Sequence, residues 1–370
     1  MLTNFPVDPR FDLSAWVGQR QATFRFALID GVTNQPLRNL TPLRSRTPSV
    51  VHDTQRTIVR TLRLDLGAAD TAAIDPINNR VLLYMVAQGV EYPLGRYMFI
   101  DSSRERYSSG SLSSLSLVDE MFIVDQSIES GFSALVTSVK SESDFGDTVT
   151  SLETIDQTAT RLIAPLPVTM RIDGTPFSSI GSWTVGTSRS RILESLTVDG
   201  DYFSPWFDND GVMRIKRTFD PSRVVPDFDF DEANKVIAGS ISETDTLLQA
   251  ANRVVVVSNG SVSESSASGP VVGVFDVPNS APHSLFNRGF VIADVREMQV
   301  DTQIQAEVIA RNIAIRSTAF EITELSTPPD PRHDGYNVIN WDGKLWLEIG
   351  WAMELVEGGS MRHTLQRVYT

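Results

Sequence analysis

The chain has 370 residues, of which 41% are apolar and 21% charged, with a formal net charge of −14 and no cysteine. This length predicts two or three domains, each with a sizeable core. The acidic balance argues against a protein that binds nucleic acid through a basic face. Without cysteine the chain has no disulfide, no thiol nucleophile and no thiolate metal site.

Targeting signals are not visible in the sequence. Residues 1–9 lack the basic start and apolar stretch of a secretory signal. The longest apolar run, Val81–Ala87, is far shorter than the roughly 20 residues that span a bilayer. We therefore expect a protein that is made in a cytoplasm and has no transmembrane segment.

The first part of the chain reads as β-structure. Residues 22–29 alternate, with Ala22, Phe24, Phe26 and Leu28 on one face. Residues 57–66 repeat the pattern, and Arg60 is the one polar residue among Ile58, Leu62, Leu64 and Leu66. Further strands are expected at 80–87, 96–101 and 112–124. Short strands without long helices between them predict an antiparallel barrel or sandwich, which we assign to residues 1–137.

A polar, turn-rich stretch at 138–150 then marks a boundary. We expect a short helix over 150–162, which ends before Pro165, and a second helix capped by Thr187 or Ser188. Asp208-Asn-Asp-Gly211 is a turn signal between two apolar runs and predicts a hairpin. The middle domain, 151–235, is therefore predicted to be α+β.

The last domain is assigned to residues 236–370. We expect a short helix over 240–251, a strand over 252–258, a mobile low-complexity loop over 258–269, strands at 271–277 and 290–295, and one long helix over 302–317. The helix is expected to pack on a sheet within the chain, although its apolar residues leave room for a subunit contact. From Leu345 to Leu355 every odd position is apolar, which predicts a long strand that bends at Gly350.

Two acidic segments have enough carboxylates for a metal site. Asp227-Phe-Asp-Phe-Asp-Glu232 has alternating carboxylates but lacks the glycine and the final glutamate of a calcium loop. A strand that buries Phe228 and Phe230 and turns its acidic side to water explains it better. The second segment is the turn at 208–211, in which the glycine falls too early for a calcium loop.

No catalytic, cofactor-binding or metal-binding residue is predicted. The four histidines, His52, His283, His333 and His363, are too far apart in sequence for a local metal motif, and His333 reads as a loop histidine. Nucleophile-elbow, phosphate-loop and dinucleotide-binding motifs are absent from the sequence. A dispersed catalytic triad or a glycosidase carboxylate pair stays open as an alternative.

Several segments together resemble a known family. In chain order they are Tyr92–Asp101, Arg191–Leu196, Tyr202–Arg214, Ala251–Ser258, the helix over 306–316, a strand pair, and Glu357–Leu365. With these segments the chain resembles the baseplate hub proteins of long-tailed bacteriophages, which are also called tail-tip or minor tail proteins. The resemblance spans nearly the whole chain.

The resemblance implies a mainly β fold, α+β overall, with two β-barrel domains that can exchange segments and smaller α+β parts. It implies a homotrimer that closes the tail tube, joins it to the tail tip and forms part of the DNA conduit. Its partners would be distal tail or tube proteins, the tape measure protein and tail-tip or spike proteins. The location would be the distal end of the virion tail, after synthesis in the bacterial cytoplasm. Neither an enzymatic activity nor a cofactor is implied.

Two other classes compete with this interpretation. A carbohydrate- or receptor-binding β-domain of a virion or cell surface would need a platform of clustered aromatic side chains. Three of the six tryptophans, Trp341, Trp346 and Trp351, lie close in sequence, whereas Trp16, Trp183 and Trp206 are scattered. A hydrolase with dispersed carboxylates is the third class.

Overall fold

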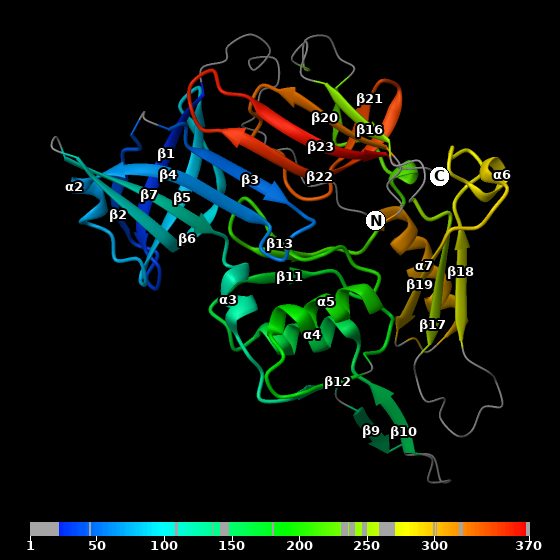
Figure 1. Ribbon diagram of the computed structural model, residues 1–370. Helices are drawn as coiled ribbons and strands as arrows, with labels where there is room; N and C mark the ends of the chain where they lie inside the picture. Colours follow the sequence, from blue (N-terminus) through cyan, green and yellow to red (C-terminus); the bar gives the residue numbers. More distant parts are fainter. Residues whose placement is uncertain are drawn as a thin grey trace.

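The structure is a computed structural model, shown in Figure 1. It describes residues 22–43, 46–107, 110–134, 136–140, 148–179, 181–230, 236, 241–245, 250–258, 271–298, 300, 302–317 and 321–367. A large sheet lies above a helical unit, and a smaller sheet with one long helix lies beside them (Figure 1). Most of the predicted loop at 258–269 falls outside the described residues.

Thirteen of the described strands belong to one sheet, in which neighbouring strands are antiparallel except for one short parallel pair. The path runs β16-β20-β23-β22-β3-β4-β7-β6-β5-β1-β2, and off this path β21 pairs with β22 and β15 with β21. This confirms the mainly β prediction. The strands are β1 (Thr23–Asp30), β2 (Pro36–Leu40), β3 (Ser49–Asp53), β4 (Arg60–Gly67), β5 (Asn79–Ala87), β6 (Val90–Tyr107), β7 (Gly110–Val118), β15 (Phe228–Asp229), β16 (Ser242–Asp245), β20 (Glu321–Thr327), β21 (Val338–Trp341), β22 (Lys344–Glu354) and β23 (Met361–Arg367).

The first and last parts of the chain meet in this sheet. Strand β22 pairs with β3 on one side and with β23 on the other, so the N-terminal and C-terminal strands form one continuous surface. No pair among the described residues joins β16 to β2. The two separate barrels and the three domain boundaries therefore stay predictions.

Strand β4 shows how the sequence pattern produces the core. Leu62, Leu64 and Leu66 are buried in the largest hydrophobic cluster, whereas Arg63 on the opposite face is exposed. The strand begins at Arg60, and residues 54–58 form turns and bends instead of the predicted strand start. Arg60 itself is only 1% exposed, so the polar residue that interrupts the apolar face lies inside the protein.

Strand β22 bends where the sequence predicted. The pairing register with β23 shifts between Glu348 and Gly350, which is the irregularity of a β-bulge. A Cβ atom on Gly350 would lie 3.0 Å from the carbonyl oxygen of His52, so glycine permits the close approach of β3. The strand is buried on both faces, because Trp346 and Glu348 are as inaccessible as Leu347 and Met353.

The middle unit is α+β, as predicted. Helix α4 (Ile155–Ile163) begins after Thr154, whose backbone N–H donates to Gln157 Oε1, and α5 (Arg189–Asp199) is capped by the Ser188 hydroxyl. The predicted strand at 112–124 is wrong in its second half, because α3 (Met121–Gln126) packs against α5. The short strands are β8 (Phe132–Ser133), β9 (Val136–Lys140), β10 (Thr148–Leu152), β11 (Met170–Ile172), β12 (Ser182–Trp183), β13 (Trp206–Phe207) and β14 (Met213–Ile215).

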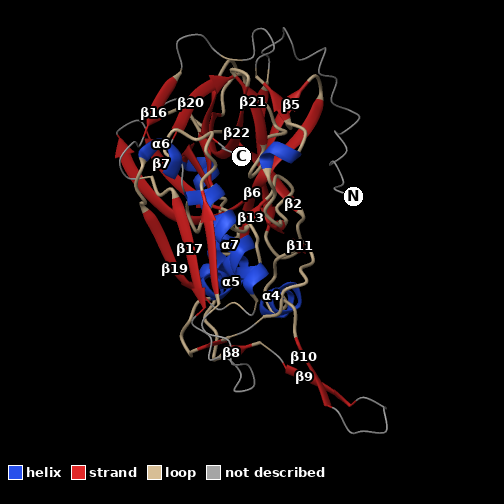
Figure 2. Ribbon diagram, turned by 90° about the vertical axis from the view of Figure 1, so that its right-hand side faces the viewer, coloured by secondary structure: helices blue, strands red, loops and turns tan. Residues whose placement is uncertain are grey.

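The third unit is a sheet of β17 (Arg253–Ser258), β18 (Val272–Asp276) and β19 (Ala293–Met298) covered by α7 (Gln303–Ser317). The helix packs on β17 and β18, and Figure 2 shows it beside this sheet. Ala306 and Ile309 pack on Val254 and Val256, as expected for an intrachain contact.

The helix predicted over 240–251 is wrong where it is described, because β16 pairs there with β20. The remaining elements are α2 (Ala68–Thr71), η1 (Pro221–Arg223) and α6 (Leu285–Arg288).

The buried face of β4 generates a stability prediction. Leu64→Ala should lower the free energy of unfolding by about 2–5 kcal/mol, because it opens a cavity in the main core. Thr61→Ala, on the less buried face, should cost less than about 1 kcal/mol. Urea unfolding of both variants measures the difference. Equal losses would mean that both faces of β4 are packed alike.

Candidate functional site

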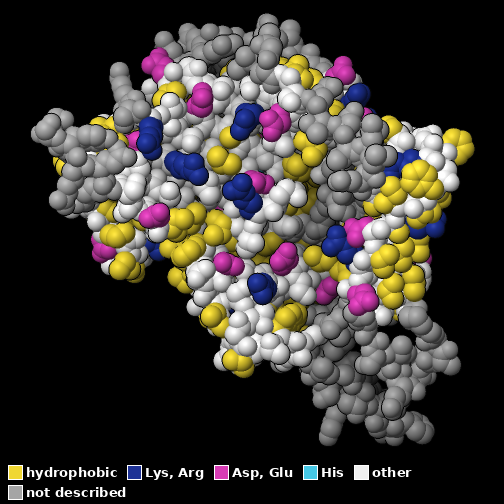
Figure 3. Space-filling model, in the orientation of Figure 1, with side chains coloured by type: hydrophobic (Ala, Val, Ile, Leu, Met, Phe, Trp, Pro, Cys, Tyr) yellow, Lys and Arg dark blue, Asp and Glu magenta, His cyan; other side chains and the backbone are white. Residues whose placement is uncertain are grey.

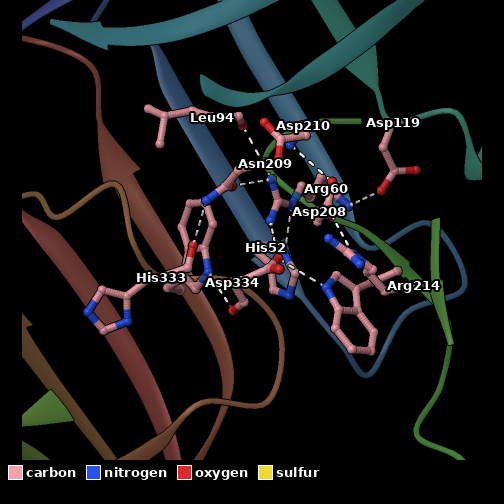
Figure 4. A network of polar contacts seen from close by, with 12 residues as sticks. His52, Arg60, Leu94, Asp119, Asp208, Asn209, Asp210, Arg214, His333 and Asp334 are labelled. Carbon is pink, nitrogen blue, oxygen red and sulfur yellow. Dashed lines mark hydrogen bonds and ion pairs between the residues drawn. The ribbon is translucent and has the colours of Figure 1, made fainter. Parts of the chain in front are cut away.

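A buried arginine lies where three segments of the chain meet (Figure 4). The Arg60 guanidinium donates to His52 Nδ1 at 2.9 Å and to the Leu94 carbonyl at 3.3 Å, both within the N-terminal part. It also donates to Asn209 Oδ1 at 2.6 Å in the middle unit and to Asp334 Oδ1 at 2.7 Å in the loop before β21. The planar fork of donors suits an arginine to this task, and a lysine would satisfy fewer acceptors.

Aromatic rings enclose the ion pair between Arg60 and Asp334. Trp206 Nε1 donates to Asp334 Oδ1 at 3.0 Å, and Trp351 Nε1 donates to the Asp334 carbonyl at 3.2 Å. The guanidinium lies 5.4 Å from the centre of the Trp351 ring, on which His52 also stacks. Burial raises the pKa of Asp334 to about 6, although the positive charge of Arg60 opposes the rise.

The turn at 208–211 fixes the middle unit against this site. Asp208 accepts hydrogen bonds from the backbone N–H groups of Asp210 and Val212, as in the predicted turn, and Arg214 Nε donates to it at 2.5 Å. The Asn209 amide then donates to the carbonyls of Pro331 and His333 at 2.9 and 3.1 Å. The turn has a structural role, because the Asp208 carboxylate accepts from three protein donors.

Removing the guanidinium should destabilise the whole chain. We expect Arg60→Met to lower the free energy of unfolding by about 3–5 kcal/mol, because Asp334 and Asn209 would lose their buried partner. Arg63→Met is the matched control, since Arg63 is exposed on the opposite face of the same strand. Thermal unfolding of both variants tests this. A loss below about 1 kcal/mol for Arg60→Met would contradict the role.

A second buried cluster consists of His333, Glu348 and His363. The Nδ1 atom of His333 lies 2.8 Å from Glu348 Oε2, and the Nδ1 atom of His363 lies 2.6 Å from Glu348 Oε1. The Nε2 atom of His363 is 2.8 Å from the Thr327 hydroxyl. The ligand-type atoms of the three residues all lie within 4.8 Å of one another. The three residues are too far apart in sequence to be recognised as one group. The one signal in the sequence was Glu348, a glutamate inside a long apolar strand.

Burial controls the protonation of this cluster. It raises the pKa of Glu348 to about 7 and lowers the pKa of His333 to about 4. The Phe228 ring stacks on His333 with centroids 3.8 Å apart, and Phe230 meets His363 edge-on. The acidic segment at 227–232 thus directs its two phenylalanines towards the cluster, as the strand interpretation expected. Residues 231 and 232 lie outside the described part of the chain.

A cavity of about 920 Å³ opens between α5, β19 and β22. Its lining includes Trp183, Arg191, Glu194, Asp199, Tyr336 and Ile349. Asp199 is the last residue of α5, so its carboxylate lies at the negative end of the helix dipole. Burial raises its pKa to about 7, whereas a hydrogen bond from Ser195 works in the other direction.

The raised pKa of Asp199 predicts a pH effect. A carboxyl group with a folded pKa above its ordinary value stabilises the fold at low pH, and this contribution is lost as pH rises from about 4 to 7. Asp199→Asn should therefore gain about 1–2 kcal/mol relative to the wild type at pH 8 and little at pH 4, because the residue is only partly buried. Unfolding at both pH values, with exposed Asp101→Asn as control, measures the difference. An equal change at both pH values would refute the assignment.

Comparisons with known proteins agree with this architecture. No family model and no curated protein matches the sequence. Among solved structures, a tail protein from Neisseria meningitidis has a TM-score of 0.59 at 10% identity, over 94% of this chain and 98% of that one. The 43 kDa tail protein of prophage MuSo2 from Shewanella oneidensis has a TM-score of 0.59 at 12% identity, over 93% and 98% of the two chains.

A third structure extends the likeness. The prophage tail protein gp18 from Listeria monocytogenes has a TM-score of 0.56 at 8% identity, over 92% of this chain and 94% of that one. The chain therefore has the fold of these tail proteins, and the resemblance to phage tail-tip proteins is confirmed at the level of the fold. Within the described part of the chain no helix has the length and apolarity to cross a bilayer.

Proposed function

We propose that the chain is a structural virion protein, a trimeric baseplate hub that closes the tail tube and joins it to the tail tip. The observation that carries the proposal is the mutual coverage of the matches: more than nine tenths of this chain corresponds to more than nine tenths of each of three tail proteins. The shared fold thus extends over nearly the whole length of this chain and of each tail protein. A role as an enzyme is not part of the proposal.

Exposed apolar surface supports assembly into a ring. One patch, the α6 patch, consists of Val274, Phe286, Phe290, Val291 and Val295, and Phe286 is 76% exposed. Val274 and Val295 lie on either side of Val255 in the sheet register, so the three side chains form one row on the outer face. Figure 3 shows apolar side chains gathered over this end of the molecule. Water-exposed apolar groups of this extent are typical of a protein contact.

A second apolar patch lies on the other side. Val32 and Ile77 are about four-fifths exposed, and their turns touch because the N–H of Gly31 donates to the Asn78 carbonyl. The strands β1, β2 and β5 that carry these turns lie opposite α6 in Figure 1. A closed ring is built from such heterologous contacts, in which one side of a subunit meets a different side of the next. The two patches are the surfaces that we assign to the trimer.

The acidic balance supports a role in the DNA conduit. A basic wall would hold phosphates and release their counterions, so DNA would stick where it has to slide. A net charge of −14 avoids such binding, and at physiological salt the repulsion decays over about 8 Å. The proposed neighbours are the tube and distal tail proteins, the tape measure protein and the tip or spike. The proposed location is the distal end of the tail.

The oligomeric state tests the proposal. Mass photometry of the full chain should show a species of three times 40.9 kDa. Val295→Asp should shift it towards single chains, because a carboxylate would be buried in the contact without a partner. Val225→Asp, at an exposed position of the middle unit, is the control and should leave the trimer intact. A protein that is strictly monomeric within intact tails would overturn the hub.

The alternative of a carbohydrate-binding platform gains no support from Trp206, Trp346 and Trp351, because all three are buried. Trp341 and Trp346 lie 5.7 Å apart, but Trp346 and Trp351 are each only 2% exposed. They contribute to the core and to the Arg60 site, where a sugar ring has no access. Trp206 is buried as well, and Trp16 lies outside the described residues. We therefore propose no second function.

A further inference from the structure

The cluster of His333, Glu348 and His363 has the composition of a metal site. Two imidazole nitrogens and one carboxylate oxygen converge from the loop before β21, from β22 and from β23. Zinc is bound by this combination in proteins, and imidazole with carboxylate is a donor set of intermediate softness that suits it. A calcium or magnesium site would instead be built from oxygen ligands. The donor set therefore points to a transition metal.

The surroundings orient these ligands. The second nitrogen of His363 is hydrogen-bonded to the Thr327 hydroxyl, which fixes the ring so that its Nδ1 atom faces the carboxylate. Metal-binding histidines are generally held in this way by a polar partner outside the ligand shell. Phe228 stacks on the His333 ring and fixes that imidazole too. All three ligand side chains are at most 1% exposed, so the site lies in the interior and one enclosed water would fill the fourth position of the ion.

The short nitrogen–oxygen distances between the ligand side chains are those of groups that share protons through hydrogen bonds. Nitrogen–oxygen separations of 2.6 and 2.8 Å are those of hydrogen bonds. Ligands at about 2.0–2.2 Å from a tetrahedral zinc ion lie about 3.3 Å apart. The ligand-type atoms here lie within 4.8 Å of one another, so the ion would draw the widest pair together by up to about 1.5 Å. Binding would displace the protons shared between the carboxylate and the rings, and these protons would be released to solvent.

We propose that His333, Glu348 and His363 bind one zinc ion per chain. The ion would join the bulge of β22 to β23 and to the loop at 328–337. That loop also carries Asp334, the partner of Arg60, so the metal would fix the same segment from its other side. The role is structural, and the proposal is independent of the trimeric hub.

The first experiment uses the full chain. After removal of metal with a chelator, titration with zinc chloride should show one ion bound per chain, with proton release and a higher melting temperature. X-ray absorption of the bound zinc should show two imidazole ligands. Because the chain has only four histidines, and His333 and His363 are the pair that converges with a carboxylate among the described residues, this spectrum identifies the site without a variant. Absence of stoichiometric binding, or a spectrum without imidazole, would overturn the proposal.

Variants sharpen the assignment. His363→Gln should weaken zinc binding at least about 100-fold, and Thr327→Val, which changes only the outer partner, should weaken it about 10-fold. His283→Gln is the matched control, since this histidine is equally buried but lies in the loop before α6. Unchanged affinity in His363→Gln, or equal losses in His283→Gln, would show that zinc binds elsewhere. If His363→Gln fails to fold, the spectrum of the wild-type protein decides.

Discussion

The fold depends on the burial of one positive charge. Arg60 is 1% exposed, and a guanidinium in such a place is stable only when its donors are all paired. The partners come from β3, β6, the turn at 208–211 and the loop before β21, which belong to segments up to 274 residues apart. Apolar packing alone tolerates small shifts between such segments, whereas a fork of directed hydrogen bonds does not. The charge therefore specifies how the three parts of the chain fit together.

The loop at 328–337 is held from two sides. Asp334 accepts from Arg60 and Trp206, while its neighbour His333 points into the cluster with Glu348 and His363. The Asn209 amide binds the carbonyls of Pro331 and His333 between these two groups. These contacts connect the loop to the middle unit and to β22 at the same time.

The sequence predicted local secondary structure well. It predicted poorly which distant residues come together in the fold. Two kinds of signal depend only on neighbours in sequence: the alternation in residues 22–29 and 345–355, and the helix cap at Ser188. The structure contains the corresponding strands and helix. The segments at 121–126 and 242–245 took the other structure, because packing against α5 and pairing with β20 overrode their local preferences. Arg60 and Glu348 stood out only as polar residues on apolar faces. Their partners are set by tertiary structure, which residue spacing does not contain.

The pairing of β3 with β22 has a consequence for synthesis. The Thr54 hydroxyl donates to the carbonyl of Ile349, 295 residues later in the chain. A ribosome that adds 5–20 residues per second needs on the order of 15–60 s to make the second strand after the first has emerged. During that interval β3 presents an open edge, to which strands of other nascent chains can add. Until β22 is made, that edge is therefore a place where two copies of the chain can pair at the wrong strand.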